Sequence, residues 1–429
     1  MAGFCILLTR AGADVIRESM SWGYVTIGMS DAEPTGVVLA ISNGNGSRRP
    51  VTVDNTHYLS VADSRPNCVW HRVPVEVNAS WILTIAQQTM IDFEEFATRV
   101  SSGLRQPGHA AYYAITHVVD DRDRYPGFPV PEFAAWYVSR DGVRSVDIDV
   151  ESERSGAALL EPHWPVGDLA GARVLLVGAG SIGGAAALAL ASAGVGTLDL
   201  LDPDRLRWHN LPRHVCGPKH VGRLKVEALR VDLGAVRPEI AIHAHERDVV
   251  ADADEVRQLL TRVDLVLCAT DGVSSRRVVS HLARRADRPA VLACVLADGA
   301  YGDILRLWPW PHHGCLMCRT EALTDSGGML PDLETATGYG GADNPMTAVG
   351  IDLHLVGQFA AKIAVATLLH SRGHHDQWTA GEHAVIALRP RPGWAAPYDL
   401  RRAGEVAWRH APTPRTGCPT CGGVDRPES

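Results

Sequence analysis

The second half of the chain alternates short apolar runs with longer amphipathic stretches, a pattern typical of parallel strands connected by helices. The apolar runs that predict strands are residues 173–177, 197–201, 240–244, 264–269 and 289–295. A long apolar helix is predicted from about Met346 to His370. The pattern indicates an α/β fold with a mostly parallel sheet and helices on both faces.

The first half has a different pattern and predicts an α+β domain over residues 1–165. Strands at 37–42 and 50–54 flank Asn-Gly-Asn-Gly, and strands at 135–140 and 143–150 flank Asp-Gly, so each pair predicts a hairpin. Between them, apolar spacing predicts one helix that Ser80 caps and that ends near Val100. A polar, proline-bearing linker at 151–168 leads to a second domain over residues 166–429. No catalytic motif is found in the first domain.

Composition narrows the class of protein. The 429 residues are 46% apolar and 21% charged, typical of compact domains, and the net charge of −8 argues against binding a nucleic-acid backbone. The uncharged run at 174–198 contains six glycines, which favours a buried strand and helix over a membrane span. No export signal is visible at the start. We therefore expect a cytoplasmic protein that contacts neither nucleic acid nor membrane.

A glycine motif marks the start of the second domain. Gly178, Gly180 and Gly183 form GxGxxG directly after a predicted strand and before a predicted helix, where backbone amides can approach a phosphate. Asp202 ends the next strand, at the position of a carboxylate that binds ribose hydroxyls. These features predict a Rossmann-like sheet. They fit a nicotinamide-dependent oxidoreductase as well as an ATP-binding enzyme.

The order of the next motifs separates these alternatives. VLLVGAGSIGG, ASAGVGTLDLLDPD, NLPRHV, VGRLKVEA and LVLCATD resemble, in sequence, the motifs of the ThiF/MoeB/HesA family of adenylyltransferases in the ubiquitin-activating-enzyme-like superfamily. With two cysteine pairs, the resemblance spans nearly all of residues 172–421. The family's arginine-containing segment before the first strand is not recognisable here.

The resemblance implies a site for ATP and magnesium. Arg213 and Lys225 would stabilise the charge that develops when a carboxylate attacks the α-phosphorus, and Asp271 would hold magnesium. The residues expected to bind the nucleotide are Gly178, Gly180, Gly183, Asp202, Asp204 and Asn210. Composition alone would favour the alternative that Arg213 and Lys225 are solvated surface cations.

Four of the nine cysteines fall into two CxxC pairs, which predicts a structural zinc site. The pairs are Cys315 with Cys318 and Cys418 with Cys421, the ligand number and spacing of a tetrahedral site. A redox CxxC is the alternative. An odd cysteine count with two such pairs suits a reducing compartment better than a disulfide framework.

The resemblance also implies a substrate class. Family members that form a thioester carry a cysteine in the loop after the first zinc pair, but no cysteine lies between Cys318 and Cys418 here. Cys216, three residues after Arg213, is the only candidate nucleophile near the motifs, and we favour its interpretation as a small apolar filler. The expected enzyme activates a C-terminal carboxylate of a small ubiquitin-like sulfur-carrier protein or a ribosomal precursor peptide, and passes the acyl-adenylate to an external nucleophile.

Three further expectations complete the hypothesis. The resemblance implies a homodimer, and the N-terminal domain could clamp the carrier or peptide. A nucleotide-binding scaffold that has lost catalysis and a dinucleotide-dependent oxidoreductase are the competing functions.

Overall fold

The structure is a computed structural model that divides into two compact units, Met1–Ser155 and Gly156–Ser429, and each is described by itself. It describes residues 4–19, 21–30, 34–44, 47–51, 59–60, 67–100, 103–120, 122–125, 127, 129–152, 158–161, 163–237, 239–309, 313–327 and 347–421.

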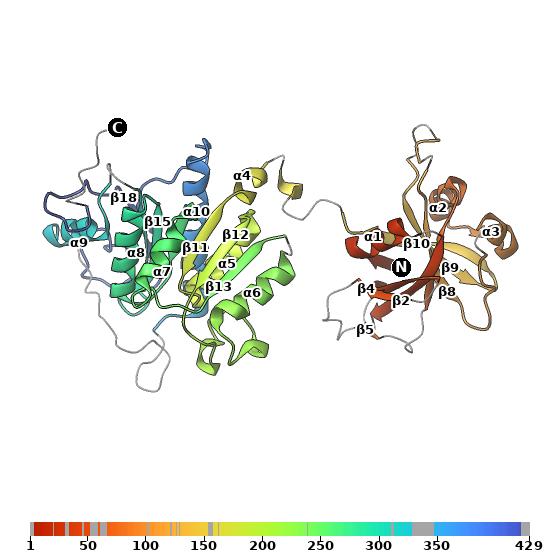
Figure 1. The fold of residues 1–429 in the computed structure, drawn as a ribbon, viewed down its shortest axis with the longest axis horizontal. Helices are drawn as coiled ribbons and strands as arrows, with labels where there is room; N and C mark the ends of the chain where they lie inside the picture. Colours follow the sequence, from red (N-terminus) through yellow and green to blue (C-terminus); the bar gives the residue numbers. More distant parts are fainter. Residues whose placement is uncertain are drawn as a thin grey trace. The chain divides into compact units, whose positions relative to one another are not determined.

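The N-terminal unit is built mainly of strands (Figure 1). Its strands are β1 (Cys5–Leu8), β2 (Trp22–Ser30), β3 (Thr35–Asn43), β4 (Arg48–Pro50), β5 (Leu59–Ser60), β6 (Cys68–Arg72), β7 (Met90–Ile91), β8 (Tyr112–His117), β9 (Phe133–Ser139) and β10 (Gly142–Val150). Its helices are α1 (Arg10–Glu18), α2 (Val75–Gln87) and α3 (Phe93–Arg99). Both predicted hairpins are present as β3–β4 and β9–β10, although positions 52–54 of the first lie outside the described residues.

Seven strands of this unit form a closed barrel. The order β3-β1-β10-β9-β8-β6-β2 returns to its start because β2 also pairs with β3. One sheet face packs Trp70, Ile115 and Phe133 against α1, and the other packs Trp136 and Val138 against α2 and α3. Closure leaves these seven strands without a free edge for another chain to pair with.

The single helix predicted from Ser80 to Val100 is wrong. Two helices, α2 and α3, are separated by the short strand β7, which pairs with β10. Helix α2 ends at Gln88, which has a left-handed backbone (φ 52°), and α3 begins at Asp92, whose side chain accepts a hydrogen bond from the Glu95 amide. Ser80 lies inside α2 and is not its cap. Periodicity alone does not show this break, because pairing with a distant strand sets it.

The C-terminal unit is a doubly wound α/β domain. Its sheet has the order β13-β12-β11-β14-β15-β16-β17-β18, parallel from β13 to β15 and antiparallel from there on. The strands are β11 (Arg173–Val177), β12 (Thr197–Leu201), β13 (Ala241–His245), β14 (Leu265–Cys268), β15 (Ala290–Leu296), β16 (Tyr301–Leu307), β17 (His383–Ala387) and β18 (Val406–Arg409). The helices are α4 (Val166–Ala170), α5 (Ser181–Ala193), α6 (Lys225–Val236), α7 (Ala253–Leu260), α8 (Val273–Arg285), α9 (Leu316–Asp325) and α10 (Gly350–His370), with short 3-10 helices at Ala158–Leu160, Trp208–Asn210 and Pro218–His220.

Helices cover both faces of this sheet, as the apolar pattern predicts. One core joins the sheet to α5, α6 and α10, and the other joins it to α7 and α8 (Figure 1). The five predicted parallel strands are present within one or two residues of their expected bounds. The predicted fold class, a mixed α/β sheet preceded by an α+β unit, is therefore confirmed.

Helix α10 is long and apolar enough, by length and composition alone, to cross a membrane. It packs instead against α5, β15 and β16, and 61% of its most apolar window is buried inside the unit. A central core helix meets the same criteria, and these contacts place α10 in the core.

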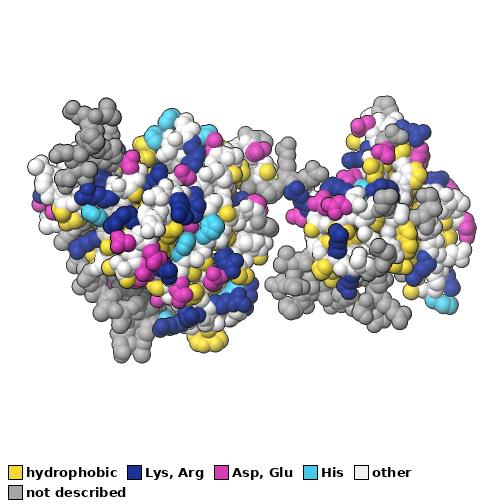
Figure 2. All heavy atoms as spheres, in the orientation of Figure 1, with side chains coloured by type: hydrophobic (Ala, Val, Ile, Leu, Met, Phe, Trp, Pro, Cys, Tyr) yellow, Lys and Arg dark blue, Asp and Glu magenta, His cyan; other side chains and the backbone are white. Residues whose placement is uncertain are grey.

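Charges of both signs are interspersed on the visible face of the C-terminal unit. Lys and Arg side chains there alternate with Asp and Glu rather than forming a continuous basic area (Figure 2).

Candidate functional site

The glycine loop joins β11 to α5 at the point where the strand order reverses, because β12 lies on one side of β11 and β14 on the other. Gly178 has a left-handed backbone (φ 92°), and a side chain at Gly183 would place its Cβ 1.8 Å from the Gly178 carbonyl oxygen. A Cβ at Gly180, in contrast, would meet no protein atom within 4 Å. Two of the three glycines are thus required by the loop itself, whereas the third borders open space.

Asp202 fixes this loop against β12. One carboxylate oxygen accepts a hydrogen bond from the Ala179 amide at 2.7 Å, and the other accepts one from the Asp204 amide at 2.8 Å. Burial raises the pKa of the Asp202 carboxyl, while the nearby Lys225 ammonium lowers it. The residue expected to bind ribose therefore already orders the loop.

Arg213 and Asp271 line the same cavity, of about 210 Å³. Arg213 follows the 3-10 helix at Trp208–Asn210, and Asp271 lies between β14 and α8. The structure therefore brings together two of the three predicted catalytic residues, from segments nearly 60 positions apart in sequence.

Lys225, at the start of α6, is not among the described residues that line this cavity. Its Nζ lies 2.7 Å from an Asp204 carboxylate oxygen and 3.9 Å from one of Asp202. Desolvation raises the pKa of the Asp271 carboxyl. The cationic charges of Arg213, Lys225 and Arg276 oppose that shift. The predicted cations thus both act electrostatically on the predicted metal ligand.

Asn210 orders the loop that carries Arg213. Its side-chain oxygen accepts a hydrogen bond from the Arg207 amide at 2.9 Å, and its backbone oxygen accepts one from the Arg213 amide at 3.0 Å. These contacts are local, and none of them places the Asn210 side chain in the cavity with Arg213.

Sequence reasoning missed His214, which connects this loop to the glycine loop. Its Nδ1 accepts a hydrogen bond from the Cys216 amide, so its Nε2 donates to the Ala179 carbonyl oxygen at 2.8 Å. Burial lowers the pKa of His214, which keeps the ring neutral. Its position next to Arg213 was the only available sequence signal.

Other cavity residues were missed as well. Arg276 comes from the first turn of α8 and is 7% exposed, and Arg391 and Trp394 come from the segment after β17. The β15–β16 turn completes the wall with left-handed backbones at Ala297 (φ 50°) and Asp298 (φ 53°). Such positions have no motif of their own, because the fold alone brings them to the cavity.

The four paired cysteines converge at another place in the C-terminal unit. Their sulfur atoms all lie within 4.8 Å of one another, and the Cys315–Cys418 and Cys318–Cys421 Sγ distances are 3.5 and 3.8 Å. Sulfur atoms on a tetrahedral zinc ion lie roughly 3.8 Å apart, given Zn–S bonds of about 2.3 Å. The donor set therefore fits zinc. His312 lies outside the described residues, and no histidine belongs to the cluster within the described part of the chain.

Helix α8 runs from the cavity to the cysteine cluster. It begins two residues after Asp271, and in its second half the Ser280 hydroxyl accepts a hydrogen bond from the Leu316 amide, next to Cys315. Near its end, an Arg284 nitrogen donates to the His313 carbonyl oxygen at 2.6 Å. One helix thus joins the two predicted sites.

Cys216 is 1% exposed, and burial raises the pKa of its thiol to about 12. A protonated, enclosed thiol is a poor nucleophile, so the geometry favours the interpretation of Cys216 as an apolar filler. All nine cysteines are free of disulfide bonds.

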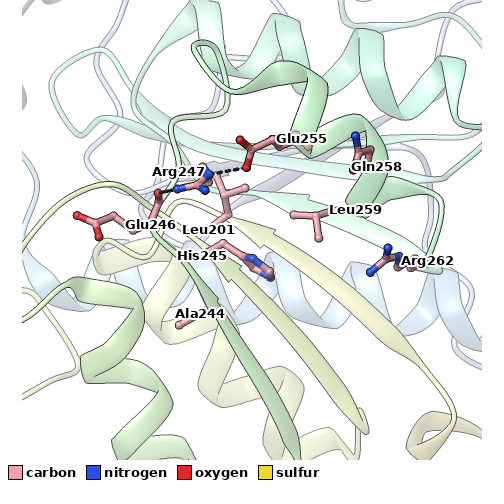
Figure 3. Close-up of a pocket in the computed structure, with 10 residues that line it drawn as sticks. Leu201, Ala244, His245, Glu246, Arg247, Glu255, Gln258, Leu259 and Arg262 are labelled. Carbon is pink, nitrogen blue, oxygen red and sulfur yellow. Dashed lines mark hydrogen bonds and ion pairs between the residues drawn. The ribbon is translucent and has the colours of Figure 1, made fainter.

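A second cavity, of about 370 Å³, lies between β13 and α7 (Figure 3). His245 faces it, with Nε2 2.9 Å from the fully buried Asp199, which also binds Arg173. An ion pair between Arg247 and Glu255 crosses its rim. None of the predicted site residues lines this larger cavity.

A glycine loop at the strand-order reversal, with cations and carboxylates around one cavity, defines the C-terminal unit as a doubly wound α/β domain with a nucleotide-type loop. The model of the ThiF family matches residues 165–382, just over half of the chain. The protein belongs to the ThiF family.

Three curated relatives are similar to this chain. "Adenylyltransferase and sulfurtransferase uba4" of Aspergillus niger is 35% identical over 168 residues, covering 38% of this chain and 34% of that protein. "Probable adenylyltransferase/sulfurtransferase MoeZ" of Mycobacterium tuberculosis is 39% identical over 124 residues (29% and 31%). "Sulfur carrier protein ThiS adenylyltransferase" of Escherichia coli is 31% identical over 147 residues (34% and 57%).

The chain spans between about a third and just over half the length of these relatives. Among solved structures, E. coli MccB matches with a TM-score of 0.45 and 17% identity, over 62% of this chain and 68% of that one.

Proposed function

We propose that this protein uses ATP to adenylate a carboxylate. The observation that carries the proposal is the shared cavity of Arg213 and Asp271 beside the glycine loop, with Lys225 acting on the same carboxylate. The relatives named adenylyltransferases support the same reaction class.

The residues around the cavity suit this chemistry. The amides of the loop and the start of α5 would bind phosphate oxygens, because a helix N-terminus favours anions. Asp202 holds that loop in place and would accept hydrogen bonds from ribose hydroxyls with its remaining lone pairs. Arg213 and Lys225 would stabilise the charge that develops at the α-phosphorus as the acyl carboxylate attacks and pyrophosphate leaves.

Two metals complete the proposal. Asp271 faces the cavity with carboxylate oxygens, the donors that magnesium prefers, and would hold that ion, which shields phosphate charge when bound. Cys315, Cys318, Cys418 and Cys421 would hold zinc, whose four sulfur ligands leave no open position for catalysis. Zinc would then fix the C-terminal segment against α9.

The acyl donor we propose is the C-terminus of a small ubiquitin-like sulfur carrier or of a precursor peptide. The sequence between Cys318 and Cys418 contains no cysteine, so we propose transfer from the acyl-adenylate directly to an external nucleophile. We further propose that the N-terminal unit holds the donor and that the protein acts as a cytoplasmic homodimer.

ATP–pyrophosphate exchange tests the reaction directly. With a panel of carrier proteins ending in Gly-Gly and of precursor peptides, we expect exchange that depends on one of these acyl donors and is abolished by Arg213→Ala. Arg230→Ala is the matched control, because Arg230 is an exposed arginine paired with Glu227 on α6.

The competing functions give different results. A scaffold without catalysis would bind ATP tightly and show no exchange with any donor. An oxidoreductase would be protected against thermal unfolding by NAD but not by ATP. Either outcome would refute the proposed adenylation.

A further inference from the structure

The N-terminal barrel carries a groove that no helix covers. Helices α2 and α3 pack over β8, β9 and β10 on one sheet face. The same face continues across β6 and β2, where a cavity of about 380 Å³ is lined by Trp22, Tyr24, Asn67, Cys68, Val69, His71, Gly103, Leu104, Arg105 and Tyr112. We call this cavity the aromatic groove.

Alternation along the strands explains why aromatic rings gather there. On β2, Val25 and Ile27 point to the enclosed face, so Trp22 and Tyr24 point to the opposite one. The Trp22 and Tyr24 rings meet edge to face at 5.4 Å, and Trp22 stacks on the His71 ring at 6.4 Å. Tyr24 is 39% exposed, so part of its ring is accessible to a partner.

The described residues that line the aromatic groove include one arginine and no carboxylate. His71 is buried, and burial lowers its pKa to about 4, so its ring is neutral near pH 7. Among the described residues that line the groove, Arg105 is the only Lys, Arg, Asp or Glu, and its guanidinium lies over the Tyr112 ring at 5.2 Å. In the described part of the chain, no carboxylate forms an ion pair with Arg105.

The barrel also limits how a partner can bind. Because its seven strands close on themselves, an extended peptide cannot add a strand between them. The strands outside the ring, β4, β5 and β7, are only two or three residues long, so we expect recognition at this unit to use side chains that fit into surface grooves. An apolar slot beside an unneutralised guanidinium complements an apolar side chain next to a carboxylate.

We propose that the aromatic groove binds a peptide segment of the acyl donor that carries an aromatic side chain flanked by acidic residues. The identity of the partner rests on the proposed adenylation, but the binding itself requires no catalysis. Trp22 and Tyr24 hold the ring, and Arg105 pairs with a carboxylate.

Fluorescence anisotropy of the full chain with three dye-labelled peptides tests the proposal. The probes are Gly-Ser-Glu-Phe-Glu-Gly, its Glu-Ala-Glu counterpart and its Lys-Phe-Lys counterpart. We expect the first to bind about tenfold more tightly than either of the others. Tyr24→Ala and Arg105→Gln should each weaken it by about tenfold.

The matched control is Arg144→Gln. Arg144 also lies over a tyrosine ring of the barrel, that of Tyr137, at 4.6 Å, but it does not line the groove. Its loss should leave peptide affinity unchanged. Circular dichroism of each variant checks that the barrel is folded, and Tyr24 is partly exposed, so its truncation should be tolerated.

Equal affinity for the three peptides, or equal losses in Arg105→Gln and Arg144→Gln, would overturn the proposal. So would sedimentation data in which Tyr24→Ala separates a dimer into monomers, because the occupant would then be a second copy. Exchange supported by the isolated C-terminal tail of the acyl donor should be the same in both groove variants. Peptide binding without exchange would refute the adenylation and leave the groove assignment intact.

Discussion

The two units form their candidate binding sites in different ways. In the C-terminal sheet, strand order reverses at β11, so the ends of β11, β12 and β14 leave a crevice where the glycine loop, Asp202 and Asp271 lie. In the N-terminal barrel, pairing of β2 with β3 closes the ring and leaves no such crevice. Backbone topology therefore creates the first site, whereas side chains on an outer face create the second.

The largest expected effect is the loss of pyrophosphate exchange after a substitution in the crevice of the C-terminal unit. Asp271→Asn keeps the shape of the side chain but removes the charge that would hold magnesium, so exchange should fall about a thousandfold. Asp254→Asn, at an exposed carboxylate on α7, should leave exchange unchanged. The measurement is the initial rate of pyrophosphate exchange for both variants, compared with that of the unsubstituted protein. Residual exchange above a tenth in Asp271→Asn would remove Asp271 from the proposed mechanism.

Shortening a buried side chain inside the barrel should lower the stability of the N-terminal unit alone. Trp70 is fully buried in the barrel, so Trp70→Ala should destabilise the N-terminal unit by about 3–5 kcal/mol. ATP binding by the C-terminal unit should not change. Calorimetry with and without ATP separates the two transitions, and Leu83→Ala, at a 58% exposed side chain on α2 of the same unit, serves as the control. Loss of ATP affinity in Trp70→Ala would show that the units are not independent.

Alanine substitutions at two glycines of one loop should have different effects, one mainly on stability and the other mainly on the KM for ATP. Gly183→Ala would force its Cβ onto the Gly178 carbonyl and should cost about 2–4 kcal/mol of stability. Gly180→Ala meets no protein atom and should cost about 1 kcal/mol or less, but should raise the KM for ATP about tenfold by occupying space over the loop. Chemical denaturation and exchange kinetics measure both. An unchanged KM in Gly180→Ala would mean that the nucleotide does not approach this position.

The smallest effect concerns the pH dependence of stability. Since the pKa of Asp271 is raised in the folded protein, its ionised form opposes folding above the unfolded-state pKa. Asp271→Asn should therefore raise Tm slightly at pH 7.5, and the gain should vanish as the pH falls toward the unfolded-state value. Thermal melts from pH 4 to 8 test this, and a gain that grows with acidity would contradict the sign.

The contrast between the units also explains what the sequence could predict. The strands around Gly178, Asp202 and Asp271 were predictable because a local motif follows each one in a fixed order. The barrel was not, because it depends on the pairing of β1 with β10, whose partners Cys5 and Asp147 lie more than 100 positions apart in sequence, and such pairing has no local signature. The helix break at Gln88 was missed for the same reason.

Within the cavity, the same limit applies residue by residue. Arg213 and Asp271 lie in motifs, but Arg276, Arg391 and Trp394 reach the wall only because α8 and the segment after β17 fold there. Their residue types are too common to predict a role from sequence.

The pairing of β1 with β10 has a consequence for synthesis on the ribosome. Strand β1 pairs with β3 on one side, but its second parallel neighbour needs residues 147–150, so the ring cannot close until nearly all of the N-terminal unit has been translated. Until then, the nascent chain exposes the edge of β1 that later pairs with β10, so a strand translated early in this unit is among the last to be completed.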